Sequence, residues 1–136
     1  MDHVAKLKEA YREWNDSKGA SVNHWMELFS DHIVFRSLAG GAPGMEFTKQ
    51  CSSKEDVKRY FAGLTADWQM LHYTPEYFIA DGDRVAVKST CAWQNKHNGK
   101  IIDTPKADFF LFSGDQVVEF FEFYDTAKAL AAASNG

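Results

Sequence analysis

Apolar residues in the first part of the chain recur with the period of a helix. From residue 4 to residue 14 they occur at every third or fourth position, the spacing that gathers side chains on one face of an amphipathic helix. The polar run at 15–20 ends this helix, and Ser21 can cap a second, short one. The expected inward residues are Val4, Leu7, Tyr11 and Trp14 in the first helix, and Val22, Trp25, Met26 and Phe29 in the second.

A strand and a third helix are expected next. The run "HIVFRSL" at 32–38 is rich in β-forming residues and predicts a strand. The glycine-rich segment at 39–51 has no regular period and predicts a loop. Ser52 and Glu55 have the spacing of a capping box, which indicates the start of a third helix. Its inward residues are expected to be Val57, Phe61 and Leu64.

Beyond Asp67 the pattern changes to strands separated by turns. Pro75 interrupts the first of four strand-like runs and indicates an edge strand or a bulge. A short Ala-rich helix opened by Asp125 follows the last run. Helices first and a four-strand antiparallel meander afterwards favour an α+β fold, and the length fits one domain, 1–136. Glycine-containing turn signals lie at 80–83, 97–100 and 113–116.

Alternation divides the side chains of the last two strands between two faces. Both faces are largely apolar, and three helices can cover only one of them. A second subunit is the simplest cover for the other, so we expect a homodimer. In the third long strand, Lys106, Asp108, Phe110 and Phe112 share one face, and Ala107, Phe109 and Leu111 the other. In the last strand, Val118, Phe120, Glu122 and Tyr124 lie opposite Val117, Glu119, Phe121 and Phe123.

Composition narrows the function. The net charge is −4 and no basic stripe is present, so we expect no nucleic-acid partner. No run approaches the roughly 20 apolar residues of a membrane span, which favours a cytoplasmic protein without a membrane partner. Cys51 and Cys91 lie far apart, the five histidines are scattered, and neither common nucleotide-binding glycine motif occurs. We therefore expect no metal and no cofactor.

Five segments in order resemble a known superfamily. They are "YREW", "LFSDHIVFRS", "DGDRVAV", "NGKIIDTPKADFFLF" and "EFYDTA", and the likeness runs from about residue 11 to residue 126. Together they resemble the nuclear transport factor 2-like superfamily, and within it the SnoaL-like and ketosteroid-isomerase-related proteins. The resemblance implies a single SnoaL-like domain with a cone-shaped, curved antiparallel sheet packed on N-terminal helices, a cystatin-like α+β barrel. It also implies an apolar cavity and dimers formed across the outer sheet face.

The resemblance to the isomerases implies roles for three residues. Tyr11 falls at the position of a tyrosine that binds the developing oxyanion, and Asp108 at that of its protonated aspartate partner. The position of the proton-transferring base holds Ser37. A hydroxyl of ordinary acidity cannot abstract a carbon-bound proton, so we do not expect steroid isomerisation.

Two other branches offer comparisons. The epoxide hydrolases use an arginine and two aspartates to activate water. Glu122 falls at one acid position, but the other two positions fall near Ser89 and Cys91, so that triad is absent. SnoaL-type cyclases use one acidic residue, for which Asp108 is the best counterpart.

Alternation and the resemblance together point Asp108 and Glu122 into the cavity. Two carboxylates in an apolar enclosure cannot both ionise cheaply. We expect Asp108 to hold its proton and to donate, with Tyr11, to a ligand carbonyl oxygen, while Glu122 acts as the base. A direct ion pair with Lys106 would instead favour ionised Asp108. In the alternative readings Asp108 and Tyr11 are only structural, and Glu122 is solvated at the cavity mouth.

The expected catalytic residues are therefore Asp108, Tyr11 and Glu122. Two classes of function stay open: a cofactor-independent isomerase-like or cyclase-like enzyme acting on a small apolar carbonyl or ring compound, and a non-catalytic dimeric module that binds one. A hydrolase of the epoxide-hydrolase type is a further alternative. The expected pocket residues are Trp14, Phe35, Ser37, Ser89, Cys91, Trp93, Phe110, Phe120 and Tyr124.

Overall fold

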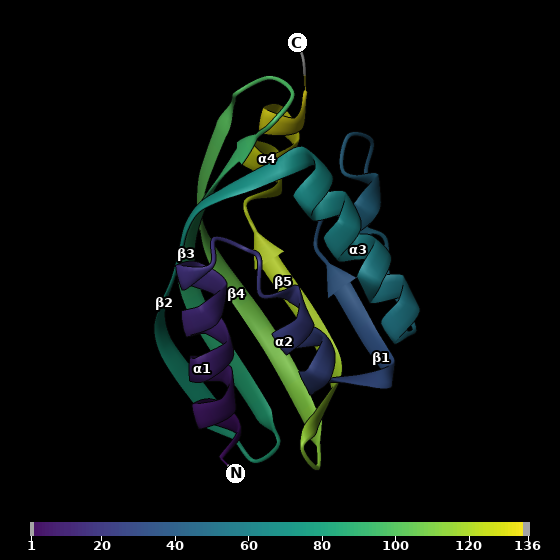
Figure 1. Cartoon of the computed structure of the whole chain (residues 1–136), viewed down its shortest axis with the longest axis vertical. Coiled ribbons are helices and arrows are strands. Elements are labelled where there is room, and N and C mark those ends of the chain that lie inside the picture. The colour runs from purple at the N-terminus through teal and green to yellow at the C-terminus, as the bar shows by residue number, and fades with distance from the viewer. Residues whose placement is uncertain (1, 135–136) are drawn as a thin grey trace.

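A computed structural model describes residues 2–134 and has an α+β architecture. Three helices pack against one face of a five-stranded sheet, and a fourth lies at the end of the sheet near the β3–β4 turn (Figure 1). The elements are α1 (His3–Asp16), α2 (Val22–Leu28), β1 (Phe29–Ser37), the 3-10 helix η1 (Glu46–Thr48), α3 (Lys54–Asp67), β2 (Trp68–Asp81), β3 (Arg84–Asn95), β4 (Ile101–Ser113), β5 (Gln116–Tyr124) and α4 (Thr126–Ala133).

The sheet confirms the predicted meander, and the strand predicted at 32–38, observed as Phe29–Ser37, joins the meander at its β5 edge. Its order is β1-β5-β4-β3-β2, with antiparallel pairs throughout except that β1 runs parallel to β5. Pro75 lies in β2, the edge strand, where the register with β3 shifts between Pro75 and Tyr77. Both interpretations of Pro75, edge and bulge, are therefore correct, because a missing N–H is tolerated at such a place.

Two predicted helix boundaries are off by one residue. Phe29 ends the turn after α2 in an extended conformation and begins β1, so it belongs to the strand. Ser53, and not Ser52, caps α3: the Ser53 hydroxyl accepts from Asp56 N at 3.1 Å, and the Asp56 carboxylate accepts from Ser52 N. The helix start thus resembles a capping box, but an aspartate takes the place of the predicted glutamate, and its carboxylate binds the N–H of the residue before the N-cap.

A bulge in β5 corrects the predicted faces of this strand. Phe110 lies opposite Phe120, but Phe112 lies opposite Val117, so the register shifts by one residue between these pairs. Val117 is consequently fully buried in the main core, whereas Val118 is only partly buried. Alternation cannot predict such a shift, because one extra residue reverses the side on which every earlier side chain lies.

The core forms two clusters between the helices and the sheet. The larger one contains the buried face of α1, including Leu7, Tyr11 and Trp14, together with the inner residues of the strands. The smaller one joins α4 to the sheet and to the loop before α3; it consists of Met45, Trp68, Ile102, Ala129 and Ala132. Within residues 2–134 no helix is both long enough and apolar enough to cross a membrane.

Candidate functional site: a tryptophan-lined cavity with a buried acid–lysine–acid cluster

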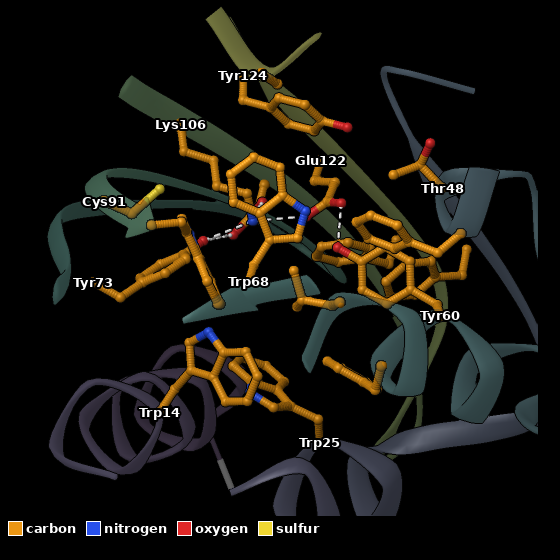
Figure 2. Close-up of a pocket in the computed structure, with 18 of the residues that line it drawn as sticks. Trp14, Trp25, Thr48, Tyr60, Trp68, Tyr73, Cys91, Lys106, Glu122 and Tyr124 are labelled. Carbon is orange, nitrogen blue, oxygen red and sulfur yellow. Dashed lines mark hydrogen bonds and ion pairs between the residues drawn. The ribbon is translucent and has the colours of Figure 1, made fainter. Parts of the chain in front are cut away.

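A cavity of about 100 Å³ lies between the helices and the inner face of the sheet. The chain has four tryptophans, and all four line it: Trp14, Trp25, Trp68 and Trp93. In Figure 2, Trp14 and Trp25 approach from the helices, and Lys106, Glu122 and Tyr124 approach from the strands. The volume is closer to that of a cavity that holds benzene, about 150 Å³, than to the roughly 300–1,000 Å³ of drug-sized sites.

Most residues that the sequence indicated line this cavity. Tyr11, Asp108 and Glu122 do so, and so do six of the expected pocket residues. Asp108 and Glu122 are directly opposite each other on the neighbouring strands β4 and β5, and both face the cavity, as the sequence predicted. The six pocket residues are Trp14, Phe35, Cys91, Trp93, Phe120 and Tyr124.

Ser37, Ser89 and Phe110 are not among the lining residues. The Ser37 hydroxyl is hydrogen-bonded to the Tyr124 hydroxyl at 2.6 Å, and this tyrosine, not the serine, faces the cavity. Ser89 is fully buried. The Phe110 ring packs on those of Trp25 and Phe120, with ring centroids 6.2 and 5.1 Å away. Trp25 and Phe120 line the cavity, whereas Phe110 lies behind them.

Lys106 connects the two acids. Its Nζ atom lies 3.0 Å from Asp108 Oδ1 and 2.8 Å from Glu122 Oε1, and it donates to the Tyr73 hydroxyl at 2.8 Å. Burial lowers the pKa of Lys106, but the attraction of Asp108 and Glu122 outweighs it and raises this pKa well above its ordinary value. The direct ion pair that the sequence left open is thus present, and Lys106 is cationic.

Three buried tyrosines complete the cluster. Tyr11 donates its hydroxyl to Asp108 Oδ2 at 2.5 Å, and Tyr73 donates to the same oxygen at 2.9 Å. On the other side Tyr60 donates to Glu122 Oε2 at 2.5 Å. Burial, and next the neighbouring carboxylate, raise the pKa of each phenol well above its ordinary value, so all three remain neutral donors.

This geometry changes the expected role of Asp108. Its neighbours Lys106, Tyr11 and Tyr73 are all donors, an arrangement that stabilises a carboxylate and not a protonated acid. The Tyr11 hydroxyl donates its one hydrogen to Asp108, so it cannot also donate to a ligand carbonyl. Glu122 is only 4% exposed, so it does not lie in solvent at the cavity mouth.

Cys91 supplies a thiol to the cavity wall. Burial raises its pKa to about 11, so the thiol form predominates at neutral pH. A thiolate nucleophile is therefore not available at this position, and Cys91 contributes an apolar, polarisable surface.

The sequence did not identify Tyr60 and Tyr73 as parts of the site. Tyr60 follows the inward Val57 by three residues, so helical spacing could have placed it on the buried face of α3. Tyr73 lies on β2 just past a register shift between Met70 and His72, which alternation along β2 does not indicate.

The profile of the SnoaL-like domain family matches residues 7–120. The chain belongs to the SnoaL-like domain family. None of the curated proteins matches it. This family assignment agrees with the resemblance found in the sequence, which spans residues 11–126.

Solved structures confirm the nuclear transport factor 2-like fold. An NTF2-like protein of unknown function from Burkholderia pseudomallei has a TM-score of 0.84 at 16% identity, with 96% of each chain covered. A protein from Jannaschia sp. CCS1, provisionally described as a SnoaL-like polyketide cyclase, has a TM-score of 0.78 at 16% identity and covers 98% of this chain and 92% of its own. A hypothetical protein from Catenulispora acidiphila with a ketosteroid isomerase-like fold, solved in complex with trimethylamine, has a TM-score of 0.75 at 18% identity and covers 94% and 91%. At these identities the likeness shows the shared fold only.

Proposed function

We propose that this SnoaL-like protein binds a small, mostly apolar ligand in the tryptophan-lined cavity. The observation that carries the proposal is the cavity itself: about 100 Å³ of space that all four tryptophans line, beside a buried acid–lysine–acid cluster. Taking charged groups out of water costs free energy, and buried clusters of titratable groups tend to gather at functional sites. The volume favours a ligand of the size of a single ring and disfavours a steroid.

A matched pair of cavity-filling variants tests this proposal. Ala129 on α4 lines the cavity, whereas Ala127 on the same helix is exposed. A panel of small ring and branched compounds should change the tryptophan fluorescence of the native protein, and mass spectrometry of the purified protein should reveal any retained ligand. Ala129→Leu should weaken binding at least tenfold, and Ala127→Leu should leave it unchanged. Equal binding by both variants, or no binding by the native protein, would contradict the proposal.

Acid–base catalysis on the bound ligand is the second candidate. It is favoured by the cross-strand pair of Asp108 and Glu122, because two carboxylates that line one cavity can both lie within reach of the same ligand, where a carboxylate can accept a proton. The cluster combines two acids with one cation, as the water-activating arginine and two aspartates of the epoxide hydrolases do. Its three residues lie on β4 and β5, at other positions than those of the epoxide-hydrolase pattern. Under this candidate Glu122→Gln should abolish turnover and retain ligand binding.

A homodimer through the outer face of the sheet is also part of the proposal. Phe109 is 49% exposed there, and its ring contacts that of Phe123, which stacks on Phe121 with centroids 4.3 Å apart. Leu111 and Ile79 extend this aromatic face into a groove. The helices α1, α2 and α3 pack on the opposite face of the sheet (Figure 1). A second copy of the chain is a cover of the right shape, because a two-fold axis brings the same face to itself.

A further inference from the structure

The charged residues of the cavity wall do not balance. Among the lining residues in the described part of the chain, Lys106 is the one cation, and Asp108 and Glu122 are two acids. All three side chains are largely buried, with exposed fractions of 12%, 2% and 5%. If both carboxylates are ionised, the wall has one uncompensated negative charge in an enclosure where water screens it poorly.

One carboxylate oxygen has spare acceptor capacity. Asp108 Oδ2 accepts from both Tyr11 and Tyr73, but Asp108 Oδ1 accepts no hydrogen bond within residues 2–134. Lys106 Nζ lies 3.0 Å from Oδ1, which is close enough for an ion pair without the angles of a hydrogen bond. The cluster can therefore accommodate a further donor or a further positive charge.

The donors that a neutral carbonyl ligand would need are already used. The hydroxyls of Tyr11, Tyr60 and Tyr73 all donate to carboxylates, and Lys106 contacts both acids and Tyr73. A carbonyl oxygen would have to displace one of these bonds. A cationic ligand would displace none of them.

Four tryptophan side chains line the cavity, and one of them contacts two of the others at different angles. The ring of Trp14 lies 6.3 Å from that of Trp25 at 88° and 6.4 Å from that of Trp93 at 55°. Tryptophan is the best aromatic partner of a cation, and several such faces around one space form the cage that organic ammonium ions occupy in proteins. The residues that build this cage are Trp14, Trp25, Trp68 and Trp93.

We propose that the ligand of this cavity is a small organic cation, an alkylammonium whose charge the Lys106–Asp108–Glu122 cluster balances and whose apolar groups the four tryptophans enclose. The cavity of about 100 Å³ sets the size, four to seven non-hydrogen atoms or about the size of benzene. The inference specifies the ligand class of the function proposed above and rests on it.

Two probes of equal size separate charge from shape. Tert-butylammonium and tert-butanol have the same branched carbon frame, and only the first is a cation at pH 7. Their binding can be followed by NMR through the indole N–H signals, since every tryptophan of the chain lines the cavity. We expect the ammonium to bind about tenfold more tightly than the alcohol, or better, and both to shift the indole signals.

A matched pair of variants assigns the preference to the cluster. Glu122→Gln keeps the shape of the side chain and leaves Lys106 balanced by Asp108 alone, so the preference for the ammonium should fall close to one. Glu27→Gln removes an exposed negative charge from α2, outside both the cavity and the outer-face groove, and should leave the preference intact. If Glu122→Gln does not fold, the ratio of the two probes in the native protein remains decisive.

The outcomes separate this inference from the function on which it rests. Equal affinities for the ammonium and the alcohol, or tighter binding of the alcohol, overturn the inference and support the cavity as a ligand site. A preference for the ammonium that both variants retain also overturns it, because the charge then acts from outside the cluster. Binding of neither probe, nor of any compound in the ring panel, overturns the proposed function itself.

Discussion

The two faces of the β4–β5 pair differ in an unusual way: the inner face buries charged residues, and the outer face exposes aromatic ones. On the inner face Asp108 and Glu122 are charged groups at 1% and 4% exposure, held by a lysine and three phenols. On the outer face Phe109 is an aromatic group at 49% exposure, with further phenylalanines beside it. Successive residues of the same two strands supply both faces, because side chains alternate along a strand.

The contrast indicates two kinds of recognition. Charges in a dry enclosure interact strongly with small ligands and are costly to leave unpaired. A partner that covers apolar rings removes them from water, and this burial stabilises the complex. The inner face therefore suits the proposed small-molecule site, and the outer face suits the proposed contact with a second copy of the chain. The expected effects of substitutions differ accordingly.

The largest effect is expected at Lys106. Lys106→Met removes the only cation of the cluster and leaves two carboxylates facing each other in an apolar cavity. Losing one partner of a buried ion pair typically costs about 3–5 kcal/mol, and we expect that range in the free energy of unfolding by urea at pH 7. Lys88→Met, which removes the partner of the half-exposed Glu76, should cost about 0–1 kcal/mol. Similar costs for the two variants would mean that the cluster does not stabilise the inner face.

The outer face should respond through association. Phe121→Glu places a charge in the aromatic groove and should weaken the proposed dimer by about 2–4 kcal/mol, the range of interface hot spots. Sedimentation at micromolar concentration should show a dimer for the native chain and a monomer for the variant. Leu71→Glu, an exposed apolar position on β2 outside this groove, should leave the dimer intact. A native chain that sediments as a monomer would refute the outer-face contact.

Alkaline pH should destabilise the inner face selectively. Burial and the neighbouring acids raise the pKa of Tyr11, Tyr60 and Tyr73, so these phenols keep their protons in the folded state and lose them near pH 10 in the unfolded state. Lys106, whose pKa the two acids raise, acts in the same direction. Their stabilising contribution is therefore complete below about pH 10 and falls as the pH rises, by up to about 1.4 kcal/mol per pH unit for each group.

The slope of stability against pH tests this assignment. Tyr60→Phe should make urea unfolding less steeply dependent on pH between about 10 and 11, because one titrating group is gone. Tyr77→Phe, at a position 52% exposed, should leave the slope as it is. Stability that rises with pH in this range would have the wrong sign for all four groups.

The sequence predicted the parts of the molecule that depend on local periodicity. The helices, the meander of the last four strands and the placement of Asp108 and Glu122 on neighbouring strands follow from spacing along one or two segments. The parallel pairing of β1 with β5 was not predicted, because it joins segments that are far apart in the sequence. The bulge near Val118 and the inward position of Tyr73 do not, because a register shift arises from how two strands pair. The cluster around Lys106 depends on α1, α3, β2, β4 and β5 together, so no single segment indicates its geometry.

The smallest effect compares two neighbours on β3. Both Ser89 and Cys91 are buried and both were expected in the pocket, but only Cys91 lines the cavity. The Ser89 hydroxyl finds no hydrogen-bond partner within residues 2–134. An unsatisfied buried hydroxyl costs free energy, so Ser89→Ala should raise stability by about 0–1 kcal/mol and leave ligand affinity unchanged. Cys91→Ala enlarges the cavity and removes contacts with whatever occupies it, so it should weaken binding of a close-fitting ligand by roughly threefold to tenfold. Urea denaturation of the two variants measures stability, and titration with the probe compounds measures affinity. If Ser89→Ala weakens binding as much as Cys91→Ala does, Ser89 also belongs to the cavity wall.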